Sequence, residues 1–419
     1  MSNTKRNVGM TAEHAHAELA RFMQDQTALP DPHPLLAWLR ENERVADVGE
    51  MRFLTRHEDV AGGYCDERLS RNRAALAESA AHSADRNADE LLKEARLASV
   101  SMLINQDEPA HRRIRKILEA TFSPRRVATW KQRIQGITDE LMITVSGKVE
   151  FDFLSELAFP LPERVICELM GVPHEDHGLW RAWSEAVVSA ARTHSPTPEK
   201  MAAVDHAHRS FYLYFKDLVA ERRKNLGDDL VSILIRAESE NDRLSEVELL
   251  GSLQMLIEAG HETTANLIAN GMYELLKHPD QYQLLRDEPD RVPAAVEEML
   301  RYASPSQFSL PRIAVEDVRI GDSVIPKGCP VVMSLHAANR DPAMFERPEE
   351  FDIRRPANHR HIAFATGPHF CLGNQFARQE AHVMFRAIVT RLPLLKLARE
   401  PRLKQSFVRA FDSLRVRVA

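Results

Sequence analysis

One long run of helical sequence constrains the fold more than any other part of the chain. The run covers residues 245–278, and it contains no proline before Pro279. Ser245 followed by Glu248 forms a capping box, a signature of a helix N-terminus. A helix of these 34 residues would be about 50 Å long and would cross most of a domain of this size. Because apolar side chains lie on nearly all of its faces, we expect this helix to be central and buried.

The middle of this run contains residues that are unfavourable inside a helix. They lie within residues 259–264, which read Ala-Gly-His-Glu-Thr-Thr. A glycine in a helix interior costs about 1 kcal/mol relative to alanine. Thr263 and Thr264 are β-branched, and their hydroxyls can bond back to the helix. Helix rules alone leave two equal explanations: Gly260 allows a close helix crossing, or it opens a gap that the protein uses.

The second informative segment covers residues 364–380. Gly367 and Gly373 indicate a tight loop, and Cys371 lies on this loop directly before a run that can be helical, residues 374–389. A cysteine at a helix N-terminus faces unpaired N–H groups and the positive end of the helix dipole, which favour the thiolate. Such a thiolate is either a nucleophile or a soft metal ligand. The alternative is a small buried apolar residue.

Composition argues against several classes of protein. The 419 residues include 44% hydrophobic residues and neither a Gly/Ser-rich linker nor an internal repeat, so we expect one domain over residues 1–419. A net charge of −6 argues against a nucleic-acid-binding protein. The four cysteines are far apart, which argues against a zinc knuckle or a disulfide framework. No apolar run approaches the ~18 residues of a membrane span, and residues 1–6 lack a signal-peptide core, so we expect a cytoplasmic protein.

Short stretches near residues 45–60, 313–335 and 400–419 have β-strand character. The middle stretch contains two glycine-containing dipeptides that are typical of hairpin turns between short apolar segments. The sequence therefore predicts a mainly helical fold with a smaller β portion in short sheets.

Basic residues are concentrated in residues 107–126, although the whole chain is acidic. His111 and Arg115 share one face of the predicted helix because they are four residues apart. One interpretation is an ordinary solvated helix. In the other, His111 and Arg115 donate to an anion, and the remaining basic residues bind an acidic partner. These remaining residues are Arg112, Arg113, Lys116, Arg125 and Arg126.

Residues 364–380 resemble the haem-binding loop of the cytochrome P450 family. The resemblance rests on seven identities in the family's spacing: Phe364, Gly367, His369, Cys371, Gly373, Ala377 and Glu380. One departure is Ala365, where the family usually has glycine, and we expect from it a mild change in loop packing. Further motifs in the family's order extend the resemblance from about Asp107 to Val418, and residues 259–264 are similar to the family's oxygen-binding groove.

The resemblance implies a single-domain P450 fold in which the long central helix lies over a haem. The cofactor would be haem b, iron protoporphyrin IX, ligated by the thiolate of Cys371. Further contacts to the haem and its two propionates are assigned to His111, Arg115, Arg312, His369, Phe364 and Gly260.

The resemblance also implies two sets of supporting residues. Glu262 and Thr263 would deliver protons to the bound oxygen. Glu298 and Arg301, three residues apart on one helix face, would hold the haem-binding loop together with an arginine that precedes it. Arg355 is the best match for that arginine, and the arginine directly before it is the alternative.

By this resemblance the protein is a monooxygenase that inserts one oxygen atom of O2 into an apolar small molecule, using two electrons from outside. A ferredoxin and its NAD(P)H-dependent reductase are the expected donors, because the chain has no flavin- or ferredoxin-like motif. They would dock at residues 112–116 and Arg378, and a monomer is expected. Within residues 406–418 we expect a hairpin whose tip reaches the active site. The predicted substrate pocket includes Leu103, Ala259, Phe308 and Phe407.

Three alternatives remain open at this point. The first is a peroxide-driven peroxygenase of the same fold. Family members that use hydrogen peroxide directly often lack an acid–alcohol pair such as Glu262–Thr263, so its presence favours the O2 route. The second is a haem-based sensor, against which the lack of a second domain counts. The third is a helical protein without haem in which Cys371 is structural.

Overall fold

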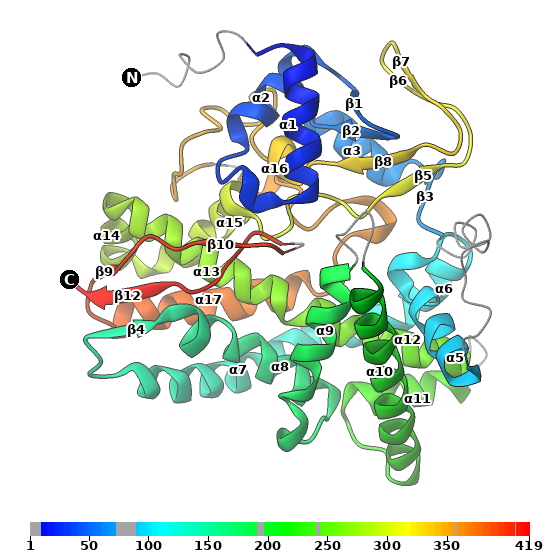
Figure 1. The fold of residues 1–419 in the computed structure, drawn as a ribbon. Coiled ribbons are helices and arrows are strands. Elements are labelled where there is room, and N and C mark those ends of the chain that lie inside the picture. The colour runs from blue at the N-terminus through cyan, green and yellow to red at the C-terminus, as the bar shows by residue number, and fades with distance from the viewer. Residues whose placement is uncertain (1–9, 73–88, 191–196, 240–243, 357, 407) are drawn as a thin grey trace.

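Helices form most of the protein, which confirms the predicted fold class (Figure 1). The computed structural model describes residues 10–72, 89–190, 197–239, 244–356, 358–406 and 408–419. The helices of the first half are α1 (Ala12–Gln24), α2 (His33–Asn42), α3 (His57–Cys65), α5 (Glu90–Val100), α6 (Ala110–Thr121), α7 (Pro124–Val145), α8 (Pro160–Met170), α9 (Leu179–Ala190) and α10 (Pro198–Lys224). Those of the second half are α11 (Leu230–Ser239), α12 (Glu246–Gly260), α13 (Glu262–Lys277), α14 (Pro279–Asp287), α15 (Val292–Ala303), α16 (Leu335–Ala338) and α17 (Asn374–Arg391).

A five-stranded sheet lies beside α1 and α2 at the top of Figure 1. Its strand order is β1-β2-β8-β5-β3, and only the β2–β8 pair is parallel. The strands are β1 (Ala46–Val48), β2 (Met51–Leu54), β3 (Leu69–Ser70), β5 (Arg312–Ala314) and β8 (Pro330–Met333). This sheet holds the buried Arg312 at the start of β5.

The remaining strands form one small sheet and two hairpins. The small sheet has the order β4-β12-β9 and brings the C-terminus against the middle of the chain. Its strands are β4 (Glu150–Asp152), β9 (Leu395–Leu397) and β12 (Arg415–Val418). The hairpins are β6 (Val318–Ile320) with β7 (Ser323–Ile325), and β10 (Leu403–Lys404) with β11 (Ala410–Phe411).

The C-terminal prediction was therefore only partly right. The predicted hairpin over residues 406–418 is in fact the β10–β11 hairpin, whose connecting residues include Ser406. β12 does not belong to that hairpin, because it pairs with β4 and β9 instead. The tip does reach the long helix, since the Ser406 hydroxyl lies 3.1 Å from a carboxylate oxygen of Glu262.

The long central helix is broken, which corrects the prediction of one uninterrupted helix. α12 begins with the predicted capping box at Ser245, but it ends at Gly260. His261 has φ −114° and ψ −50°, and α13 begins at the next residue. At the break, the Thr263 hydroxyl donates to the Ala259 carbonyl at 3.0 Å. A side-chain donor that competes for a helix carbonyl weakens the backbone ladder, and the adjacent glycine adds to that weakness.

Close packing fixes α13 against α15 and α17, the helix that follows Cys371. A Cβ atom at Gly271 of α13 would lie 2.5 Å from Met299 Sδ on α15 and 2.9 Å from Phe385 Cζ on α17. Any larger residue at position 271 would therefore require the Met299 and Phe385 side chains to shift. The loop of residues 363–373, which we call the cysteine loop, directly precedes α17. Within the described parts of the chain, no helix combines the length and the apolarity needed to cross a membrane.

Candidate functional site

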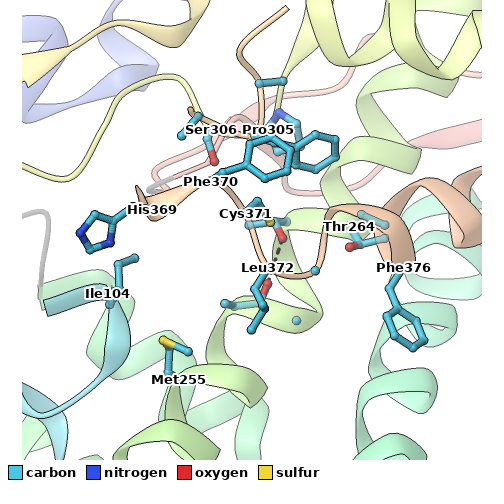
Figure 2. Close-up of a pocket in the computed structure, with 18 of the residues that line it drawn as sticks. Ile104, Met255, Thr264, Pro305, Ser306, His369, Phe370, Cys371, Leu372 and Phe376 are labelled. Carbon is cyan, nitrogen blue, oxygen red and sulfur yellow. Dashed lines mark hydrogen bonds between the residues drawn. The ribbon is translucent and has the colours of Figure 1, made fainter. Parts of the chain in front are cut away.

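One cavity of about 330 Å³ joins the cysteine loop to the break in the long helix. Cys371 lies on one side, and Met255 and Thr264 contribute to the lining from α12 and α13 (Figure 2). Pro305 and Ser306, which follow α15, and Ile104, which follows α5, add further lining. Segments that are far apart in the sequence thus converge on the cysteine.

The cysteine loop holds Cys371 by backbone contacts. The Cys371 N–H donates to the Phe364 carbonyl at 2.9 Å, which closes the loop. Ala365 has φ +59°, in the left-handed region where a Cβ atom is unfavourable, and Gly367 has φ +70°. The family's usual glycine at position 365 would avoid that strain, so the departure noted in the sequence lies at a conformationally demanding position.

The acidity of Cys371 differs from the expectation based on the helix N-terminus alone. Burial raises the pKa of the thiol above its usual value, although the N–H groups of Gly373 and Asn374 and the charges of Arg115 and Arg378 oppose this effect. In the protein alone, desolvation therefore outweighs the helix end. A bound metal cation reverses this balance, because a coordinating thiol is deprotonated. The site thus fits a metal ligand better than a free nucleophile.

Two histidines lie along one edge of the cavity. The rings of His111 and His369 are 4.2 Å apart between centroids. Burial, followed by the charges of His111, Arg312 and other cations, lowers the pKa of His369 to about 2. His111 Nε2 is buried and has no hydrogen-bond partner among the described residues. Such an unpaired buried nitrogen calls for a ligand or an ordered water.

The two arginines of this edge are anchored, and both also line the cavity. Arg115 Nε contacts Glu119 at 2.6 Å, and its Nη1 donates to the Phe370 carbonyl at 2.9 Å. Arg312 donates to the Leu69 carbonyl at 3.0 Å, and its guanidinium lies 5.2 Å from the centre of the Tyr64 ring. Burial lowers the pKa of the Arg312 guanidinium. This edge therefore favours an anionic ligand.

Arg71 also lines the cavity, although the sequence analysis did not identify it. Its guanidinium donates to the Ile104 carbonyl at 3.1 Å and to Asn105 Oδ1 at 3.1 Å. It thus ties the end of β3 to the short 3₁₀ helix Leu103–Asn105. No local pattern marks this residue, because its partners lie more than thirty residues away in the chain.

The opposite wall of the cavity comes from the helix break. Ala259, Gly260 and Thr263 all line it. A Cβ atom at Gly260 would lie 2.8 Å from Ile166 Cγ1 on α8, so this glycine also allows a close helix crossing. Both explanations offered for Gly260 from the sequence therefore have support in the structure. The carboxylate of Glu262 contacts Ser406 instead of lining the cavity.

Three of the four predicted pocket residues lie at the cavity. Leu103, Ala259 and Phe308 line it. Phe407 lies outside the residues that the structure describes. Phe364, assigned as an apolar wall near the cysteine, lines the cavity as well.

A buried ion cluster joins α15 to the segment of residues 339–355 that precedes the cysteine loop. Glu298 and Arg301 are fully buried, and Arg301 donates to both carboxylate oxygens of Glu298 at 2.8 Å. Arg355 donates to Glu298 Oε1 at 3.1 Å, so the structure places this arginine, and not the one before it, in the cluster. Arg301 also donates to the carbonyls of Asn339 and Pro348. These contacts satisfy a buried charge that would otherwise be very costly.

Comparison with known proteins agrees with this arrangement. A family model described as Cytochrome P450 matches residues 192–410. Cytochrome P450 107B1 of Saccharopolyspora erythraea is 37% identical over 392 residues, which make up 90% of this chain and 91% of that protein. The chain belongs to the cytochrome P450 family. Another relative of this P450, the vitamin D(3) 25-hydroxylase of Pseudonocardia autotrophica, is 38% identical over 374 residues, 88% of each chain.

A solved structure resembles this P450 over nearly its whole length. It is the crystal structure of the myxobacterial cytochrome P450 CYP267B1 in complex with myristic acid, with 32% identity and a TM-score of 0.85. The match covers 95% of this chain and 99% of that chain. This P450 is therefore an oxidoreductase of the haem-thiolate monooxygenase type, and a cysteine thiolate ligates haem iron in its family.

The residues around the cavity fit a haem. The cavity offers a half-buried cysteine as a soft ligand, apolar walls, and an edge of arginines and histidines that suits two carboxylates. The unpaired Nε2 of His111 would gain a hydrogen-bond acceptor from a haem carboxylate. The donor set thus agrees with the cofactor that the family carries.

Several basic side chains of the predicted docking surface, residues 112–116 and Arg378, are paired with acidic side chains. Arg113 Nη1 contacts Glu248 at 3.1 Å, and Arg378 binds Glu297 through Nε at 2.6 Å. Arg115 is bound to Glu119. Arg112 keeps 80% of its side chain exposed, although it contacts Glu108. Only part of the predicted docking surface is therefore available for a partner.

Proposed function

We propose that this P450 is a haem b monooxygenase whose iron is ligated by Cys371 and whose substrate is an apolar small molecule. The observation that carries the proposal is that Cys371 lines one side of the cavity while Ala259 and Thr263 line the other. When bound, a thiolate-ligated haem supplies the reductive activation of O2. The overall reaction consumes one substrate C–H bond, O2, two electrons and two protons, and it forms one C–O–H group and one water.

His111, Arg115, Arg312 and His369 would hold the two propionates. Their common position at the cavity edge and the unpaired His111 nitrogen support this assignment. Hydrogen bonds to charged groups are stronger than neutral ones, especially where water is excluded. Phe364 would shield the sulfur from water, since it lines the cavity beside Cys371.

Thr263 and Glu262 would handle the two protons. The Thr263 hydroxyl lines the cavity, and its proton is held at the Ala259 carbonyl. By rotating about χ1, this hydroxyl could donate into the cavity instead. Glu262 is held outside the cavity by Ser406, at the tip of the β10–β11 hairpin. A carboxylate that exchanges between Ser406 and the cavity would carry protons inward as a general acid.

The two electrons would come from an acidic ferredoxin and its NAD(P)H-dependent reductase, with this P450 as a monomer. The exposed side chain of Arg112, on the helix that carries His111 and Arg115, supports docking at α6. Electrostatic steering depends on salt. The Arg112→Glu variant should therefore be reduced more slowly at low salt, and equal rates would rule out this surface. Arg21→Glu is the matched control, because Arg21 is an exposed arginine on α1 that also pairs with a glutamate on its own helix.

The substrate would be a medium-sized to large apolar molecule. Support comes from the apolar side chains of Leu103, Ile166, Met255 and Phe308 along the cavity. The relatives point the same way, because one is named a vitamin D(3) 25-hydroxylase and another was crystallised with myristic acid.

Isotope labelling tests the proposed reaction. With a substrate found by spectral titration, ¹⁸O2 and a ferredoxin system should give a product that contains one heavy oxygen. The Thr263→Ala variant should consume electrons while releasing peroxide, because the proton donor at the cavity is lost. An unlabelled product would overturn the O2 route. Equal turnover with hydrogen peroxide alone would favour the peroxygenase alternative.

A further inference from the structure

Glu297 lies at the centre of a hydrogen-bond network behind the cysteine loop. Its two carboxylate oxygens accept from Arg378 Nε at 2.6 Å and from Arg378 Nη2 at 3.0 Å. His361 Nε2 lies 3.1 Å from Glu297 Oε2. Glu297 belongs to α15, Arg378 to α17, and His361 to the segment that leads into the cysteine loop. One carboxylate thus joins three separate segments.

The first branch of the network reaches the start of the cysteine loop. The Ala363 N–H donates to His361 Nδ1 at 3.2 Å. Because Nδ1 accepts this bond, Nε2 carries the ring proton and donates it to Glu297. Ala363 directly precedes Phe364, whose carbonyl accepts the Cys371 N–H. This branch therefore fixes the start of the cysteine loop, where the Phe364 carbonyl accepts the Cys371 N–H.

The second branch reaches the end of the loop at Cys371 itself. Arg378 Nη1 donates to Asn374 Oδ1 at 2.9 Å, and Asn374 Nδ2 donates to the Cys371 carbonyl at 2.8 Å. The backbone N–H groups of Gly373 and Asn374 also act on the Cys371 thiol, because they lower its pKa against the effect of burial. Asn374 therefore contacts the Cys371 carbonyl through its side chain, and Arg378 fixes that side chain.

The side chains of the network are shielded from solvent, and their polar atoms are hydrogen-bonded to one another or to the cysteine loop. Only 1% of the His361 side chain, 16% of the Glu297 side chain and 20% of the Arg378 side chain are exposed. Burial alone would raise the pKa of Glu297, but hydrogen bonds from His361 and Arg378 and the charge of Arg378 lower it to about 2. The Arg378 guanidinium also lies 4.5 Å from the centre of the Phe364 ring. Bidentate arginine–carboxylate pairs are geometrically specific as well as strong.

We propose that Glu297 clamps both branches of the cysteine loop and so positions the N–H groups that face the Cys371 sulfur. Glu297, Arg378 and His361 are positioning residues, since none of them lines the cavity. The clamp rests on the proposed function of Cys371 as the haem ligand. Hydrogen bonds to a ligating thiolate moderate its charge, and residues that orient a metal ligand typically matter 10- to 100-fold for metal binding. In this proposal Arg378 positions the cysteine loop and does not dock an electron donor.

Substitutions that remove the charge of one partner test the clamp. Glu297→Gln and Arg378→Gln should each weaken haem retention about 10-fold or more, measured as haem transfer to an excess of apomyoglobin. In the reduced carbon monoxide complex of each variant, a larger fraction of the haem than in the wild-type protein should show the blue-shifted Soret band of thiol ligation. The double variant should be no worse than the worse single variant, because the two residues act through one contact. Arg378→Lys keeps the positive charge but cannot donate two parallel hydrogen bonds to Glu297, so its effect should be intermediate.

Arg386→Gln is the matched control, because this arginine lies on the same helix and pairs with Asp290 at the surface. Far-UV circular dichroism of each variant separates a misfolded chain from a loosened loop. If the wild-type protein itself lacks the thiolate-type band, the proposed ligand fails and the clamp fails with it. If the wild type has the band and folded Glu297→Gln and Arg378→Gln match Arg386→Gln in haem retention and spectrum, the clamp alone is wrong.

Discussion

Replacing Gly251 with alanine tests how α12 packs against α5. A Cβ atom at Gly251 would lie 2.2 Å from the Ala98 carbonyl oxygen and 3.2 Å from the Ala98 carbonyl carbon. Carbon–oxygen contacts of this kind normally span about 3.3–3.6 Å, so the two helices would have to separate by roughly 1 Å. The obstacle is backbone and not the end of a flexible side chain, and it cannot be avoided by a change of rotamer.

The size of the effect follows from two opposing contributions. Alanine in place of glycine favours a helix by about 1 kcal/mol. Overpacking a tight interior costs about 1–3 kcal/mol, and a backbone collision belongs at the upper end of that range. We therefore expect Gly251→Ala to lower the free energy of unfolding by about 1–2 kcal/mol.

Gly136→Ala on α7 is the matched control. A Cβ atom there would meet only Arg133 Nη1 at 4.0 Å, so this substitution should stabilise the protein. Urea unfolding of the two haem-bound variants, followed by far-UV circular dichroism, should separate them by about 2–3 kcal/mol. Equal stability of the two variants would refute the packing argument.

Two further predictions concern the cysteine loop and its clamp. Ala365→Gly removes the strain of a left-handed backbone, about 1–2 kcal/mol, but it raises the conformational entropy of the unfolded chain. The net gain in the free energy of unfolding should be about 0.5–1 kcal/mol. An unchanged or lower thermal midpoint would contradict this. The lowered pKa of Glu297 predicts a contribution to stability that is fully present above the ordinary pKa near 4.5 and is lost as pH falls toward about 2. The wild-type advantage over Glu297→Gln should therefore shrink across that window in acid unfolding, and an advantage that is independent of pH would count against the assignment.

The cysteine loop could be predicted from sequence because its information is local. Gly367, Cys371 and the start of α17 lie within a few residues of one another, and their spacing follows from one turn and one helix end. The Glu298–Arg301 pair is likewise a contact across one helical turn. Patterns of this kind depend little on the rest of the fold.

The break in the long helix and the partners of the basic residues could not be predicted in the same way. The break depends on the Thr263 hydroxyl taking the Ala259 carbonyl, one outcome of a competition that the sequence leaves open. Arg113 and Arg378 find acidic partners 135 and 81 residues away, respectively, so a basic stretch in the sequence does not give a basic surface. The buried state of Cys371 also depends on the whole fold, which explains why the helix-end argument misjudged its pKa.

The assignment of Cys371 as the haem ligand is tested most directly by the absorption spectrum of the reduced carbon monoxide complex. The wild-type protein should show the red-shifted Soret band of thiolate ligation, and folded Cys371→Ser should lose it. Cys167→Ser, at a buried cysteine that does not line the cavity, should keep the band. A thiolate-type band that persists in Cys371→Ser would contradict the account.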